Sequence, residues 1–176
     1  MAWFTRTKPA AQPAPQAGEH RVRTEGLWLK CDGCRQIIWR KALEENLSVC
    51  PKCDYHFKID AATRLRLLFD GGDYDVFDST LVSTDPLGFV DQKPYKERLA
   101  AMKQATSLQD ALISAVGRLK GRRVHICAEE LKFIGGSMGA VHGEMIARAV
   151  ERSLAQRTPL ITASASGGAR MQEGAV

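Results

Sequence analysis

The stretch of sequence that decides the fold is "PLITASASGGARMQEG", residues 159–174. The apolar run 159–163 is typical of a buried β-strand, and Gly167 and Gly168 separate it from what we expect to be the first turn of a helix. Paired glycines leave the main chain bare and permit dihedral angles that other residues avoid. The first N–H groups of a helix are unpaired and carry partial positive charge. The junction therefore predicts a main-chain site for a negatively charged oxygen.

A second glycine pair follows the same logic in "FIGGSMGAVHGE", residues 133–144. Gly135 and Gly136 precede a helix expected over 140–157, whose predicted apolar stripe is Val141, Met145, Ile146, Ala149, Val150 and Leu154. Neither loop has the glycine spacing of a P-loop or of a dinucleotide fingerprint. One such loop alone could serve close packing only. Two of them, about 30 residues apart and flanking one helix, favour a functional site.

The remaining elements predict an α/β fold. Asp60 is typical of a helix N-cap, and the helix that follows is expected to end at Gly71. A short strand is possible within 73–82, and a second helix is expected to begin with Pro94. Residues 111–131 predict two strands joined by a tight turn at Lys120 and Gly121.

Four of the five cysteines form a C-x2-C-x15-C-x2-C pattern, namely Cys31, Cys34, Cys50 and Cys53. This spacing predicts a zinc ribbon, because each C-x2-C turn directs two sulfurs at one point. Four thiolates leave no open coordination position, so the zinc is expected to be structural. His56 could replace a ligand, although a surface or packing role is the favoured interpretation. Cys127 is expected to be a small buried apolar residue.

An alternative function for the ribbon is nucleic-acid binding, since basic residues alternate there with Trp28, Trp39, Tyr55 and Phe57. Packing of these aromatic rings within the ribbon is the preferred interpretation. The net charge of +5 permits phosphate-bearing partners without requiring them.

The chain of 176 residues is expected to divide into a flexible tail over 1–24, a zinc ribbon over 25–58 and a larger domain over 59–176. The sequence contains neither the apolar core of a signal peptide nor a run long enough to cross a bilayer. We therefore expect a cytoplasmic protein.

Together, "CDGC…CPKC", "FIGGSMGAVHGEMIARAVE" and "PLITASASGGARMQEG" resemble the family of β subunits of bacterial acetyl-coenzyme A carboxylase carboxyltransferases. The resemblance implies a crotonase-like domain of repeated ββα units after the ribbon. It also implies transfer of a carboxyl group from carboxybiotin to acetyl-coenzyme A, which gives malonyl-coenzyme A for fatty-acid synthesis. The implied partners are a carboxyltransferase α subunit, a biotin carboxyl carrier protein and, in the wider complex, biotin carboxylase.

The resemblance also implies roles for residues. Gly167 and Gly168 would hold the thioester oxygen of the enolate through their N–H groups, with Ala169 as a further donor. Gly135, Gly136, Ser137 and Met138 would help to form the coenzyme A pocket. Arg170 is a further substrate-binding candidate, with an ion pair to Glu173 as the alternative.

Family members continue for about another hundred residues, so the resemblance implies a truncated chain that is inactive alone. His125, His142 and Glu144 are expected to be structural, because no partner for catalysis is evident in the sequence.

Overall fold

The computed structural model describes residues 26–174, and the tail expected over 1–24 lies outside this range. The chain divides into two compact units between Tyr55 and His56. Within the described residues, no helix combines the length and the apolar character that a membrane span requires.

The first unit is a small ribbon. Strands β1 (Trp28–Lys30) and β2 (Ile37–Trp39) pair antiparallel, with Trp28 opposite Trp39, and helix α1 (Arg40–Glu45) follows directly. Within residues 26–55, the buried apolar side chains apart from cysteines are Ile38 and Leu43. Because this core is small, it supplies little free energy of folding, and the unit needs a cross-link such as a metal ion.

The second unit is built on a four-stranded sheet in the order β3-β4-β5-β6. The strands are β3 (Tyr74–Phe77), β4 (Leu112–Leu119), β5 (Arg122–Glu129) and β6 (Leu160–Ala163). Strands β3, β4 and β5 are antiparallel neighbours, whereas β6 runs parallel to β5. The helices of this unit are α2 (Ala61–Leu68), α3 (Tyr95–Thr106) and α4 (Ala140–Gln156), with short 3₁₀ turns η1 (Asp70–Gly72), η2 (Ile134–Gly136) and η3 (Met171–Glu173).

The β4–β5 turn confirms the predicted hairpin. Lys120 and Gly121 both have positive φ, at 51° and 76°, as a two-residue type I′ turn requires. The Asp70 carboxylate accepts hydrogen bonds from both of their N–H groups, at 2.8 and 2.7 Å. The turn is therefore stabilised by the Asp70 carboxylate as well as by its own residues.

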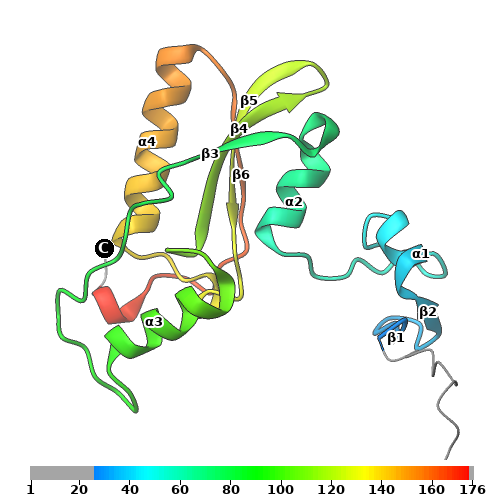
Figure 1. The fold of residues 1–176 in the computed structure, drawn as a ribbon, viewed down its shortest axis with the longest axis horizontal. Helices are drawn as coiled ribbons and strands as arrows, with labels where there is room; N and C mark the ends of the chain where they lie inside the picture. The colour runs from blue at the N-terminus through cyan, green and yellow to red at the C-terminus, as the bar shows by residue number, and fades with distance from the viewer. Residues whose placement is uncertain (1–25, 175–176) are drawn as a thin grey trace, which may run out of the picture. The chain divides into compact units, whose positions relative to one another are not determined.

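Helices α2 and α4 cover opposite faces of the sheet (Figure 1). On one face, Leu65 of α2 packs with Ile113 and Ile126. On the other face, Met145 of α4 packs with Leu112 and Cys127. Successive side chains along β4 and β5 thus pack alternately into two apolar cores, one on each face of the sheet. Cys127 is 1% exposed, as expected.

Helix α2 begins where the sequence predicts, since Asp60 Oδ1 accepts the Thr63 N–H at 2.7 Å. Helix α3 begins one residue later than expected, because Pro94 is its N-cap rather than its first residue. Its buried Tyr95 and Leu99 pack with Phe133 just before η2.

Three local expectations are wrong. The buried row of α4 runs through Val141, Met145 and Ala149 to Ser153, so Val150 and Leu154 remain 41% and 73% exposed. Strand β6 is not buried, because it lies at the edge of the sheet that the described residues form. The segment after Gly168 forms the single 3₁₀ turn η3 rather than the first turn of an α-helix.

Candidate functional site

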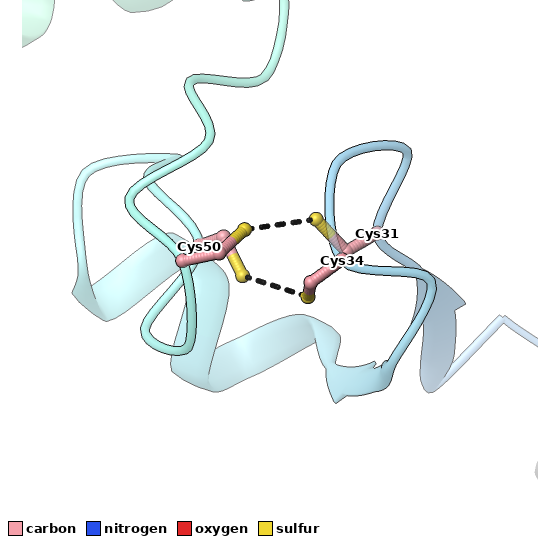
Figure 2. A group of neighbouring side chains, drawn as sticks. Cys31, Cys34 and Cys50 are labelled. Carbon is pink, nitrogen blue, oxygen red and sulfur yellow. Dashed lines mark hydrogen bonds between the residues drawn. The ribbon is translucent and has the colours of Figure 1, made fainter.

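The four cysteines of the ribbon converge on one point (Figure 2). Their sulfurs lie within 4.8 Å of one another, with 3.7 Å between Cys31 and Cys53 and 3.9 Å between Cys34 and Cys50. A tetrahedral zinc ion with Zn–S bonds of about 2.3 Å requires sulfurs about 3.8 Å apart. The geometry therefore fits four-thiolate zinc coordination.

The electrostatics of the cluster also favour a cation. Burial opposes ionisation of Cys31, but the N–H groups of Cys34 and Gly33 lower its pKa to about 7. For Cys53, the Tyr55 N–H lowers the pKa, while burial and the three neighbouring sulfurs raise it to about 12. A divalent ion bound by these sulfurs would stabilise the thiolate forms of Cys31 and Cys53 by its positive charge.

The candidate ligand set among the described residues consists of these cysteines and excludes His56. Because four thiolates close a tetrahedron, the zinc holds the ribbon together and has no position for substrate.

The two glycine loops meet in the second unit, where we term residues 134–138 the first glycine loop and 164–169 the glycine corner. Gly167 N–H donates to Gly135 O at 2.9 Å, and Met138 N–H donates to Gly168 O at 2.9 Å. Arg170 N–H then donates to Met138 O at 2.8 Å. This is a short parallel bridge between segments about 30 residues apart in sequence.

This bridge corrects the expectation for Gly167, because its N–H is already bonded within the protein and is not a free donor. Gly168 N–H donates to the Ser166 hydroxyl at 3.1 Å. Ala169 is the bridging residue opposite Met138. In a parallel bridge the flanking residues bond to the partner, so the Ala169 N–H points away from Met138.

Close approach of the two loops explains why Gly136 is a glycine. Its φ is +67°, and a Cβ at this position would lie 2.1 Å from Ala165 O. The Ser166 hydroxyl donates to Gly136 O at 2.6 Å and strengthens the same contact. Gly136 is buried in this contact, whereas Met138 is 40% exposed beside the glycine corner.

A buried ion-pair network lies beneath the corner. The Arg170 guanidinium is fully buried and bonds to Asp110 at 2.7 and 2.9 Å, to Ser137 O at 2.6 Å and to Glu173 at 3.3 Å. The ion pair with Glu173 is therefore confirmed, and the buried guanidinium does not reach solvent to contact a substrate. Tyr95 completes the network, because its hydroxyl donates to Glu173.

Glu173 connects this network to α4. Its carboxylate accepts the Ala140 N–H at 2.7 Å, together with the hydroxyls of Ser83 and Tyr95. Burial raises the pKa of Glu173, but these donors and Arg170 outweigh it and lower the pKa overall. Burial and the Glu173 contact raise the pKa of Tyr95 to about 12.

Sequence reasoning missed Asp110 and Tyr95. Asp110 lies 60 residues before Arg170, and Tyr95 lies 78 residues before Glu173. A lone acidic residue before an apolar strand is also typical of a solvated loop. The expected structural roles of the histidines and Glu144 agree with their contacts, which are His125 with Gln156, His142 with Glu129 and Glu144 with Arg148.

Comparison with known families identifies both units. Residues 28–53 match the acetyl-CoA carboxylase zinc finger domain, and residues 79–176 match the carboxyl transferase domain. The chain belongs to the carboxyl transferase family. The predicted structural zinc ribbon of Cys31, Cys34, Cys50 and Cys53 is confirmed. The family match does not favour the nucleic-acid-binding alternative for the ribbon.

Relatives cover almost the whole chain. The acetyl-coenzyme A carboxylase carboxyl transferase subunit beta of Citrifermentans bemidjiense is 47% identical over 174 residues, which is 98% of this chain and 61% of the relative. A Salinispora arenicola protein named for subunits beta/alpha is 44% identical over 161 residues, 92% of this chain and 27% of that protein. This carboxyl transferase chain thus spans about three fifths of the length of the beta-subunit relative.

A solved structure supports the fold. The 12S transcarboxylase, determined with hydrolysed methylmalonyl-coenzyme A bound, aligns with a TM-score of 0.53 and 27% identity over 66% of this chain and 20% of that one. The β4-β5-α4 segment is one ββα unit, followed by the parallel strand β6. The expected α/β, crotonase-like fold preceded by a zinc ribbon is confirmed.

Proposed function

We propose that this chain forms part of a cytoplasmic acetyl-coenzyme A carboxylase carboxyltransferase. The reaction moves a carboxyl group from carboxybiotin, carried by a biotin carboxyl carrier protein, to acetyl-coenzyme A and yields malonyl-coenzyme A. The family match and the name of the Citrifermentans relative support this proposal. The relative named for subunits beta/alpha supports an α subunit as the partner. Biotin carboxylase would act in the wider complex.

The observation that carries the proposal is the pairing of the two glycine loops. In this pairing the Gly167 N–H donates to Gly135 O, whereas the N–H of the exposed residue Ala169 points away from the bridge. Within residues 26–174, the one hydrogen-bond partner of the Gly168 N–H is the Ser166 hydroxyl. That hydroxyl keeps its own donor bond to Gly136 O if the Gly168 N–H turns to a ligand. We therefore assign the oxyanion donors to Gly168 and Ala169.

These donors suit the proposed chemistry. The proton lost from the acetyl methyl group would pass to the ureido nitrogen of biotin, and the negative charge that remains develops on the thioester oxygen. Fixed N–H groups stabilise that charge more than they stabilise the substrate carbonyl. Carboxybiotin supplies the carboxyl group when it is bound. We propose that four residues of the first glycine loop line the coenzyme A pocket, namely Gly135, Gly136, Ser137 and Met138. The exposed Met138 side chain offers an apolar surface there.

The test is Gly168→Ala in the full-length subunit assembled with its partner subunit. Gly168 has φ +116°, and a Cβ there meets no atom within 4 Å. The substitution therefore changes the direction of the Gly168 and Ala169 amides by backbone strain rather than by crowding. We expect malonyl-coenzyme A formation to fall about 10²-fold or more, as for loss of one oxyanion donor, while the zinc content stays the same.

The matched control is Gly121→Ala. Gly121 also has positive φ, +76°, and open space around its Cβ position, but it lies in the β4–β5 turn. This control should lose stability and keep its rate of carboxyl transfer. Unchanged turnover in Gly168→Ala would refute the donor assignment, and a parent complex that forms no malonyl-coenzyme A would refute the proposed function.

A further inference from the structure

Glu129 lies directly behind the glycine corner. It is the last residue of β5 and is 8% exposed. Its Oε2 accepts the Ala165 N–H at 2.5 Å, and its Oε1 lies 3.3 Å from His142 Nε2. A single carboxylate thus joins three elements, namely the end of β5, the first turn of α4 and the chain leaving β6.

His142 completes this contact as a neutral imidazole. Its side chain is 5% exposed, and burial lowers its pKa although Glu129 and Asp110 oppose that effect and Arg170 adds to it. Its Nδ1 has no hydrogen-bond partner within residues 26–174. The single N–H of the neutral ring is therefore best placed on Nε2, where it donates to Glu129.

The neighbouring carboxylate has a different task. Glu130 is 5% exposed, and it accepts the Ala61 N–H at 2.9 Å and the Lys132 N–H at 3.0 Å. It therefore anchors the start of α2, on the opposite face of the sheet from α4. Glu129 and Glu130 are both buried glutamates that accept two N–H groups. Within residues 26–174, the side-chain hydrogen bonds of Glu129 include one to the glycine corner, whereas those of Glu130 go to Ala61 and Lys132.

We propose that Glu129 is a positioning residue for carboxyl transfer, which fixes the direction of the Gly168 and Ala169 amides by holding Ala165 against α4. This inference rests on the proposed function. The corner contains two adjacent glycines, whose backbone has more freedom than that of other residues. A fixed point at Ala165, three residues before Gly168, limits that freedom. Support of this kind matters because a displacement of about 1 Å at reacting groups can cost about 10²-fold in rate.

The experiment compares Glu129 and Glu130 variants of the full-length subunit in its assembled complex. Glu129→Ala removes both contacts, and we expect kcat to fall roughly 10- to 100-fold with little change in the KM for acetyl-coenzyme A. Amide hydrogen exchange in a peptide covering 164–170 should become faster. Glu129→Gln keeps an acceptor for Ala165 and can pair with the other tautomer of His142, so it should restore most of kcat. Glu129→Asp keeps the charge but is too short to reach both partners, so it should remain impaired.

Glu130→Ala is the matched control, and it should lower the melting temperature without this loss of kcat. The inference is overturned if folded Glu129→Ala retains kcat within twofold of the parent, or if both alanine variants lose kcat in proportion to their melting temperatures. If Glu129→Ala does not fold, the comparison of Glu129→Gln with Glu129→Asp decides. A higher kcat for Glu129→Gln supports the positioning role, and a higher kcat for Glu129→Asp overturns the inference. An inactive parent complex refutes the proposed function instead, so the two failures are distinguishable.

Discussion

Arg170 and Asp110 form a fully buried bidentate pair, with Nη1 2.7 Å from Oδ2 and Nη2 2.9 Å from Oδ1. The pair joins the residue after the glycine corner to the residues that lead into β4. Because Arg170 Nη2 also donates to Ser137 O, one guanidinium fixes both glycine loops to the sheet. Its role in the described structure is to position the loops.

Removing Arg170 should be strongly destabilising. Arg170→Met leaves Asp110 and Glu173 buried without their cation, so the free energy of unfolding should fall by about 3–5 kcal/mol. Urea denaturation measures this change. Arg148→Met is the control, because the Arg148 side chain is 43% exposed in its pairs with Glu144 and Asp78, so its removal should lower the free energy of unfolding much less. A loss below about 1 kcal/mol for Arg170→Met would contradict the importance of the network.

Tyr95 should make stability sensitive to alkaline pH. Its pKa is raised from 10.0 to about 12 in the folded protein, so the unfolded chain loses this proton first. The resulting stabilisation is complete below pH 10 and is lost as the pH rises toward 12, by at most about 2–3 kcal/mol. Comparing the unfolding free energies of the parent and Tyr95→Phe from pH 9 to pH 12 isolates the effect. Parallel curves for the two proteins would contradict it.

Zinc should be bound only through the ribbon cysteines. We expect one zinc ion per chain by elemental analysis, and Cys50→Ser should lose it and unfold the ribbon. Cys127→Ala is the control, because this buried thiol lies in the sheet rather than in the cluster. Zinc loss in Cys127→Ala, or full zinc content in Cys50→Ser, would be inconsistent with the assigned ligand set.

Two glycines of the second unit should respond in opposite directions to alanine. Gly136→Ala places a Cβ 2.1 Å from Ala165 O at a positive φ, so the loops must separate and stability should fall by several kcal/mol. Gly143→Ala, in α4 with open space around its Cβ, should raise stability by about 0.5–1 kcal/mol. Melting temperatures of the two variants provide the measurement. Equal shifts would show that the contact with Ala165 does not constrain Gly136.

Local sequence signals were sufficient for much of the fold. The hairpin at Lys120 and Gly121, the N-cap at Asp60 and the zinc ribbon all depend on residues close in sequence or on fixed spacing, and the structure has them where expected. Burial was harder to predict. Leu154 lies on the expected stripe, yet it is exposed because the buried row of α4 continues through Ser153 instead.

The hydrogen bonds inside the candidate site could not be predicted, because they join residues that are far apart in the sequence. The contacts of Asp110 with Arg170, Tyr95 with Glu173 and Glu129 with Ala165 span 36 to 78 residues. They depend on how the sheet and the loops meet. The two acidic residues in "CAEEL" give no local sign that each accepts a hydrogen bond from the main chain. The glycine pair is likewise evident in the sequence, but nothing near it in the sequence indicates that the Gly167 N–H donates to Gly135 O.

Glu129 and Glu130, at the end of β5, link the position of the glycine corner to the length of the β4–β5 turn. Side chains alternate between the two sides of a strand, so inserting one residue after Gly121 would shift β5 and exchange the sides that Glu129 and Glu130 face. Both anchors would then be misplaced together, about 23 Å from the inserted residue by the rise of an extended strand. The length of a two-residue turn thereby governs where the glycine corner is held.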